Sequence, residues 1–269
     1  MEGASRAALK TSRRALNEAL DGESDASSIG EDLLAVSGVI GGSAVLRRAV
    51  ADPSREGKDR AGLINRLFAG RVTDAAQEVA RTVASQRWAR DAHVPQALEE
   101  LAVEAFLANA QSHDRLGQVE DELFRFNRIV SATPDLQAAM SDRRAQKSAK
   151  GDLVKKLIGD KVAPETLRLA SHAVATPTLR FDRAIASYLD IAADRQSQVT
   201  AIVTSATELS SEQRERMAAA LAKQAGRDVN INVVIDPDVL GGVRVEMADE
   251  VIEGTISNRL AAARRHVAR

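Results

Sequence analysis

The chain contains no cysteine among its 269 residues, and it is poor in aromatic residues and proline. Without cysteine it has no disulfides, no thiolate metal ligands and no cysteine nucleophile. Aromatic residues make up only 3% of the chain, so its cores must be built from alanine, leucine, valine and isoleucine. No stretch approaches the roughly 18 apolar residues of a membrane span, and nothing near the start resembles a signal peptide. We therefore expect a mainly helical protein with no membrane span of its own.

Charge is balanced along the chain. The net charge is −1, and each of the three parts 1–92, 93–196 and 197–269 has nearly equal numbers of basic and acidic residues. A nucleic-acid-binding domain usually carries an excess of basic residues, so nucleic acid is not an expected partner. Hydrophobic residues make up 44% of the sequence, which is enough for the cores of two or three domains.

The residue types that carry chemistry are scattered. The four histidines lie far apart in sequence, at His93, His113, His172 and His266. This spacing does not predict a metal site, and no G-x-x-x-x-G-K-[ST] sequence predicts a phosphate-binding loop. We expect no catalytic residues, no cofactor and no bound metal.

The first 180 or so residues contain an internal duplication. Residues 32–80 align with residues 122–170 at an offset of 90 without a gap, and eight of the 49 pairs are identical. Conservative pairs such as Val39 and Ile129 strengthen the match. We interpret the two segments as copies of one unit.

Each copy has the periodicity of short amphipathic helices. One apolar stripe, with steps of four, three and four residues, consists of Val119, Leu123, Phe126 and Val130. Aspartate and proline residues interrupt the pattern at short intervals, which is typical of a compact bundle. The sequence predicts two tandem helical bundles, residues 1–92 and residues 93–196, with a boundary near Asp91–Pro95.

The last part of the chain, residues 197–269, has a different pattern. Residues 199–205 and 229–235 are rich in β-branched residues and predict two strands. Between them, Ser210 and Ser211 precede Glu212 and Gln213, a capping-box pattern at a helix start. We predict a small α+β domain at the C-terminus of a mainly α protein.

The most specific segment runs from Asp236 to Leu260. The alternation of Val243, Val245 and Met247 predicts a strand with one buried face. Gly241–Gly242 precedes it at a sharp bend, and Gly254 frees the backbone before a predicted final helix. None of these residues has the character of a catalytic group.

This segment resembles the C-terminal signature of the delta subunits of bacterial F-type ATP synthases, relatives of the mitochondrial oligomycin-sensitivity-conferring protein. The residues that carry the resemblance are Asp236, Pro237, Gly241, Gly242, Asp249, Glu250, Gly254, Arg259 and Leu260. Ala248 stands where the family usually has glycine. The resemblance extends back to about residue 95, so residues 1–92 would be an extra copy of the family's N-terminal bundle, as in the lengthened actinobacterial subunits.

The resemblance implies a non-catalytic subunit of the peripheral stalk, or stator. In the family, the helical bundle binds N-terminal helices of the alpha subunits, and the C-terminal domain binds the C-terminal region of the b subunit. The implied location is the cytoplasmic side of the cell membrane, as a peripheral part of the complex. The alternative is a helical adaptor of another multi-subunit assembly.

Two groups of basic residues are candidate contacts with acidic residues of a partner. They are Arg143, Arg144, Lys147, Lys150, Arg264 and Arg265. The other interpretation is a solvated surface, and near the C-terminus a complement to the dipole of a final helix.

Overall fold

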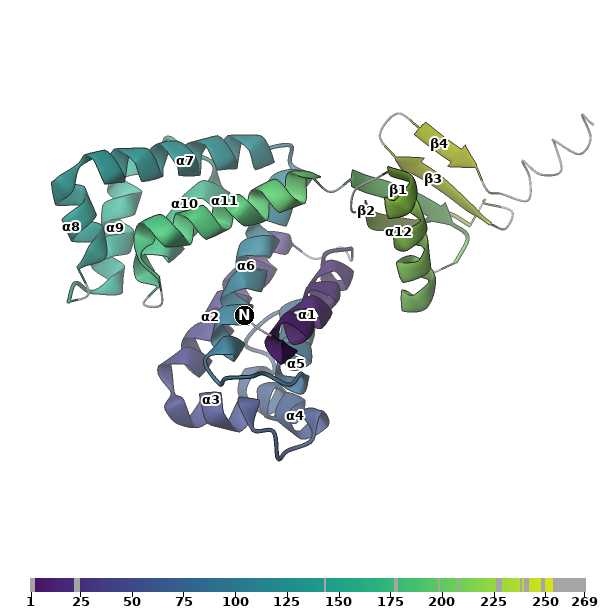
Figure 1. Cartoon of the computed structure of the whole chain (residues 1–269), viewed down its shortest axis with the longest axis horizontal. Helices are drawn as coiled ribbons and strands as arrows, with labels where there is room; N and C mark the ends of the chain where they lie inside the picture. The colour runs from purple at the N-terminus through teal and green to yellow at the C-terminus, as the bar shows by residue number, and fades with distance from the viewer. Residues whose placement is uncertain are drawn as a thin grey trace, which may run out of the picture. The chain divides into compact units, whose positions relative to one another are not determined.

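The computed structural model describes residues 3–21, 25–142, 144–176, 179–197, 199–207, 209–225, 229–237, 239, 242–247 and 250–253. Within these residues the chain forms twelve α-helices and one four-stranded sheet (Figure 1). Contacts divide the chain into two compact units, Met1–Ala192 and Ala193–Arg269. The predicted class, mainly α with a small α+β part at the C-terminus, is confirmed.

Six helices make up the first part of the larger unit. They are α1 (Ala4–Asp21), α2 (Ala26–Gly42), α3 (Ala44–Ala51), α4 (Gly57–Phe68), α5 (Asp74–Ser85) and α6 (His93–Ser112). Several begin where the sequence supplies a capping side chain. Asp25, Ser43 and Thr73 accept backbone N–H bonds in the first turns of α2, α3 and α5.

Five helices follow α6, and the last of them continues past Ala192, where the larger unit ends. They are α7 (Leu116–Ala132), α8 (Pro134–Ser141), α9 (Lys147–Ile158), α10 (Pro164–Ala175) and α11 (Phe181–Ser197). Pro134 and Pro164 stand at the first positions of α8 and α10, where a missing N–H costs nothing.

The helix boundaries repeat at the offset of 90 residues. The bounds of α2, α3, α4 and α5, shifted by 90, coincide residue for residue with those of α7, α8, α9 and α10. Shifted in the same way, α1 covers residues 94–111, which lie inside α6. The duplication inferred from sequence is therefore present in the order and length of the helices.

A tertiary hydrogen bond repeats as well. The Asp32 carboxylate on α2 accepts the N–H of Thr73 at 2.7 Å, just before α5. In the second copy the Glu122 carboxylate on α7 accepts the N–H of Ala163 at 2.9 Å, just before α10. Each carboxylate lies 41 residues before its partner in the sequence. Each accepts a backbone N–H at the start of α5 or α10 that has no hydrogen-bond partner within that helix.

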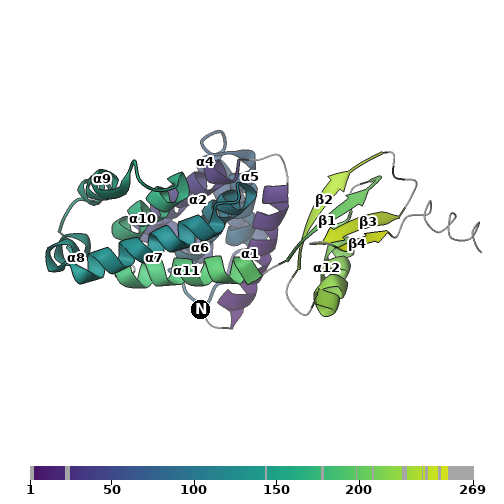
Figure 2. The same ribbon diagram turned by 90° about the horizontal axis from the view of Figure 1, so that it is seen from above.

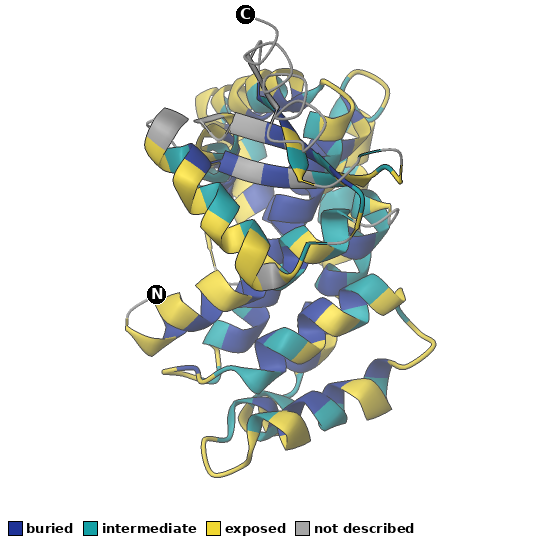
Figure 3. Ribbon diagram, turned by 90° about the vertical axis from the view of Figure 1, so that its right-hand side faces the viewer, coloured by how far each residue is buried: buried dark blue, intermediate teal, exposed yellow. Residues whose placement is uncertain are grey.

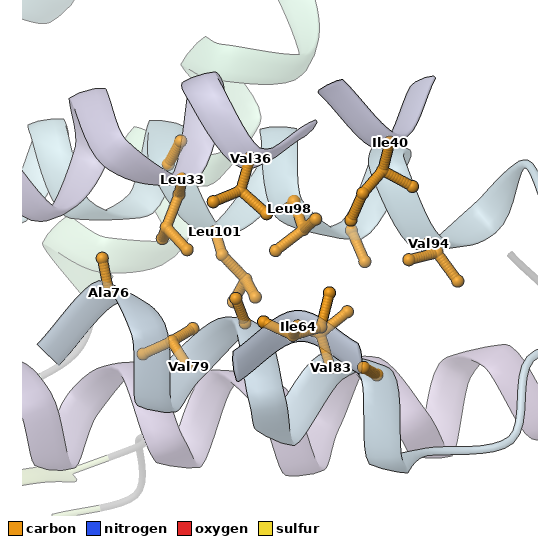
Figure 4. Packing of buried hydrophobic residues seen from close by; sticks show 14 of the residues in the cluster. Leu33, Val36, Ile40, Ile64, Ala76, Val79, Val83, Val94, Leu98 and Leu101 are labelled. Atoms are coloured by element: carbon orange, nitrogen blue, oxygen red, sulfur yellow. The ribbon is translucent and has the colours of Figure 1, made fainter. Parts of the chain in front are cut away.

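Helix α6 belongs to the cores of both copies. Its first half packs with α1, α2, α3 and α5, and Figure 4 shows Leu98 and Leu101 beside Leu33 and Val36 of α2, with Val94 nearer Ile40. Its second half contributes to a separate cluster with α7 to α11. The members from that half are Val103, Phe106, Leu107 and Ala110. Along the helices the buried residues form one side and the exposed residues the other (Figure 3).

Helix α6 begins at the boundary predicted between the two helical bundles. The boundary predicted between residues 92 and 93 falls at the start of α6, yet α6 packs into both cores. Both copies lie in the one unit Met1–Ala192. The division into bundles 1–92 and 93–196 and a domain 197–269 stays a prediction.

The smaller unit is a sheet covered by a helix. Its elements are β1 (Val199–Ser205), α12 (Ser211–Ala225), β2 (Val229–Ile235), β3 (Val243–Met247) and β4 (Glu250–Glu253). The strand order is β2-β1-β3-β4, with β1 and β2 parallel and the other pairs antiparallel. Helix α12 lies on one face of the sheet (Figure 2), where Leu221 packs on Ala201 and Val203.

The capping box predicted before α12 is confirmed. The N–H of Gln213 donates to Ser210 Oγ at 3.2 Å, and the N–H of Ser210 donates to Gln213 Oε1 at 2.9 Å.

Candidate partner-binding surfaces

The C-terminal signature begins as a turn at the end of β2. The N–H of Asp236 donates to Ser205 O at 2.9 Å, which extends the pairing of β1 with β2. The carbonyl of Asp236 accepts the N–H of Val239 at 3.2 Å, so the chain turns through Pro237. Gly242 has a backbone φ angle of +85°, which residues other than glycine rarely adopt. Asp236, Pro237 and Gly242 therefore shape the backbone.

Strand β3 has one buried and one exposed face, as its alternation predicts. Val245 and Met247 are buried against α12 and β1. On the other face Arg244 and Glu246 form an ion pair at 3.0 Å. Glu250 pairs with Met247 as the first residue of β4. The remaining signature positions lie outside the described residues: Gly241, Ala248, Asp249, Gly254, Arg259 and Leu260.

Apolar side chains are exposed on the edge strand beside the signature. Strand β2 is at one edge of the sheet, and Val234 and Ile235 at its end are 46% and 51% exposed. Exposed apolar residues at a sheet edge are a typical contact for another chain. This surface is continuous in sequence with Asp236 and Pro237.

Three of the six basic residues predicted as partner contacts are described, and they lie just before α9 or in its first turn. Arg144 follows α8, where its N–H donates to Asp142 Oδ1 at 2.8 Å, and its side chain is exposed. Lys147 is exposed in the first turn of α9, and Lys150 is half-buried with Nζ donating to Met140 O at 3.1 Å. Arg143, Arg264 and Arg265 lie outside the described residues.

A hollow of about 320 Å³ opens beside these lysines. It lies among the end of α8, the start of α9, the end of α10 and the start of α11. Its apolar lining includes Met140, Val174 and Phe181, which are buried, and Leu179, which is 47% exposed. Arg180, whose Nε also pairs with Asp182 Oδ1 at 3.3 Å, adds a third cation to Lys147 and Lys150. The sequence did not point to Arg180, Leu179 or Phe181.

A polar cluster joins the two copies behind this hollow. The Glu99 carboxylate on α6 accepts two hydrogen bonds. One comes from Ser37 Oγ of α2 at 3.5 Å, and the other from Thr176 Oγ1, just after α10, at 3.4 Å. Burial raises the pKa of Glu99 above its usual value. His172 stacks on Tyr188, and burial, with a smaller effect of Lys147, lowers the pKa of His172 to about 4.

His93 and His113 each lie within hydrogen-bonding distance of a neighbouring polar group. His93 Nδ1 lies 2.8 Å from Ser5 Oγ, and His113 Nδ1 lies 2.8 Å from Asn109 O. Within the described residues, no three histidine, aspartate or glutamate side chains gather in the manner of a metal site. His266 lies outside them. Trp88 is part of the first core, with Nε1 donating to Val83 O at 2.8 Å.

Within the described ranges, no single helix is long and apolar enough to cross a membrane. Helices α2 and α3 reach the required length and composition only as a pair bent by 106°. Leu33, Val36 and Ile40 of α2 are buried in the first core, whereas Val39 is 50% exposed.

Comparison with known proteins links the chain to a single group. A family model described as ATP synthase delta (OSCP) subunit matches residues 102–267, beginning inside α6. A protein named ATP synthase subunit delta from Kineococcus radiotolerans is 41% identical over 268 residues, 99% of this chain and 97% of that one. Proteins of the same name from Streptomyces coelicolor and Nocardia farcinica are each 41% identical, and they cover 100% of this chain and 98% and 100% of their own. The first helical copy thus has counterparts in these relatives.

Proposed function

The chain belongs to the ATP synthase delta (OSCP) subunit family, and from this premise we propose that it ties the catalytic headpiece to the membrane-anchored stalk. As a member of that family it is a non-catalytic, peripheral-stalk subunit of the F-type ATP synthase. In the proposed arrangement the helical unit binds N-terminal helices of the alpha subunits. The smaller unit binds the C-terminal region of the b subunit. The chain then acts on the cytoplasmic side of the cell membrane, as a peripheral component.

The observation that carries the proposal is the match to relatives of one name over at least 97% of both chains. The two-unit organisation supports it, because a tether needs a binding surface at each end. A bundle of amphipathic helices suits binding of another amphipathic helix. On the smaller unit, the exposed Val234 and Ile235 of the edge strand provide an apolar surface for the b subunit.

An adaptor in a different assembly, the alternative that the sequence left open, has no observation in its favour. The three relatives align along the whole chain and carry the name of an ATP synthase subunit.

Co-purification tests the proposal. The full chain would be mixed separately with a peptide copying the N-terminal helix of an alpha subunit and with a peptide from the C-terminal region of the b subunit, both from the same organism. We expect both to be retained, with little change at higher salt, because apolar burial is less sensitive to salt than charge pairing. Val234→Asp should weaken only binding of the b peptide. Retention of neither peptide by the folded chain would refute the proposal.

A further inference from the structure

The two copies differ at one equivalent helix contact, which is α4 with α5 in the first copy and α9 with α10 in the second. In the first copy, Gly57 opens α4 directly against the end of α5, and a Cβ at Gly57 would stand 2.7 Å from Ser85 O. No larger residue fits there without movement. The equivalent position in the second copy, 90 residues later, is Lys147. Helix α9 therefore cannot approach the end of α10 as closely, and the hollow lies between Lys147 and Ala175, the equivalent of Ser85.

A second substitution acts at the same place. Arg60 in the first copy is 3% exposed, and its guanidinium fills the space between α4 and the end of α5. It donates to the carbonyls of Ala84, Ser85 and Gln86 at 2.9, 2.8 and 3.0 Å. The equivalent residue in the second copy is Lys150, which donates to Met140 O. One copy is closed at this point by an arginine, whereas the other is open and lined by a lysine.

The first copy has a hollow at a partly equivalent place, where Arg90 corresponds to Arg180, but the charge of its lining differs. It lies between α3 and residues 88–91 and is lined by both signs of charge, Arg48 and Arg90 with Asp52 and Asp91. Among the described residues, the hollow of the second copy is lined by Lys147, Lys150 and Arg180 and by no acidic residue. Its positive rim above an apolar floor thus differs from the mixed charge around the hollow of the first copy.

We propose that this hollow binds an acidic, amphipathic segment of a partner subunit in the ATP synthase complex. One apolar side chain of the segment enters between Met140, Val174 and Leu179, and neighbouring carboxylates pair with Lys147, Lys150 and Arg180. The charge of the rim requires acidic groups, and the exposed Leu179 at the mouth offers apolar area to cover.

The size of the hollow also favours a side chain over a whole helix. Its volume of about 320 Å³ is near the lower end of ligand pockets, which span roughly 300–1,000 Å³. A helix with its side chains is about 10–12 Å across, so it can place only one or two residues in the hollow. The inference rests on the proposed function, because the partner is another subunit of that complex.

Site-specific crosslinking tests the inference, and the absence of native cysteine makes it direct. The variant Leu179→Cys would be labelled with a benzophenone maleimide and then assembled with the other subunits of its complex. We expect the crosslink to fall in an acidic segment of another subunit, as located by mass spectrometry. Adding Lys147→Glu and Lys150→Glu should lower the crosslink yield about tenfold, because both charge pairs become repulsive.

Lys155→Glu with Lys156→Glu is the matched control. It makes the same charge change in α9 at two exposed residues that do not line the hollow, and it should leave the yield unchanged. A crosslink to a second copy of this chain, to a segment without acidic residues, or of equal yield in the charge-reversed variant would overturn the inference. Because the Leu179→Cys chain is otherwise native, its crosslink site is informative even if the charge-reversed variant fails to fold. Failure of the labelled chain to join the complex would instead contradict the proposed function.

Discussion

Gly30 is the single residue on which the packing of α2 against α6 depends most closely. A Cβ at this position would stand 2.9 Å from two ring atoms of Phe106, which is 1% exposed and has no room to move. Gly30→Ala gains about 1 kcal/mol of helix propensity and loses about 1–3 kcal/mol to overpacking. We expect a net loss of stability, measured by urea unfolding of the full chain.

Gly38 in the same helix is the matched control. A Cβ there has nothing within 4 Å, so Gly38→Ala should stabilise the protein by about 0.5–1 kcal/mol. If both substitutions stabilised the chain equally, the close approach of α2 to α6 would be wrong.

His172 makes stability depend on pH. Its pKa in the folded chain is lowered to about 4, mainly by burial, whereas an unfolded histidine titrates near 6.5. The unfolded chain therefore takes up a proton first as the pH falls. The stabilising contribution of His172 is complete above pH 6.5 and is lost between about pH 6.5 and pH 4, by at most about 3 kcal/mol.

His172→Phe keeps an aromatic ring beside Tyr188 and removes this titration. We expect its free energy of unfolding to fall less steeply than that of the native chain between pH 6.5 and pH 4. If the free energy of unfolding fell equally steeply between pH 6.5 and pH 4 in the native chain and in His172→Phe, His172 would not be buried as described.

At the scale of elements, α6 should couple the two helical copies. Leu101 is fully buried in the first core, and Phe106 and Leu107 of the second core follow it in the same helix, about one and a half turns later. Leu101→Ala should cost about 2–5 kcal/mol and speed amide hydrogen exchange in α7 as well as α2. Leu123→Ala, in α7, is the comparison, with its strongest effect in the second copy. Unchanged protection of α7 in Leu101→Ala would mean that the copies fold independently.

Local sequence signals predict the elements well where a residue fixes the backbone. The alternation of residues 229–235 predicts β2 with its observed bounds, and Pro134 and Pro164 mark the starts of α8 and α10. The sharing of α6 was missed because its start was interpreted as a boundary. Its sequence did contain a signal, since residues 101–108 are apolar except Glu104. A helix that is apolar on all sides is buried on all sides.

At the scale of the whole molecule, the sequence identifies the family and the order of its parts. The basic cluster is visible in sequence, but the hollow beside it depends on how closely two helices approach. That distance follows from a Cβ at Lys147 where the first copy has Gly57, which is apparent only once the offset of 90 is matched with the packing. Arg180 and Phe181 join the site just before α11 and at its first residue, 30 and 31 residues after Lys150.

The central claim is that one chain holds the headpiece and the b subunit at the same time. Native mass spectrometry of the full chain, mixed with the catalytic headpiece and a peptide from the C-terminal region of the b subunit, tests this most directly. We expect a ternary complex with a single copy of the chain, and loss of only the b peptide with Val234→Asp. Separate binary complexes that never combine, or no binding to either component, would contradict the account.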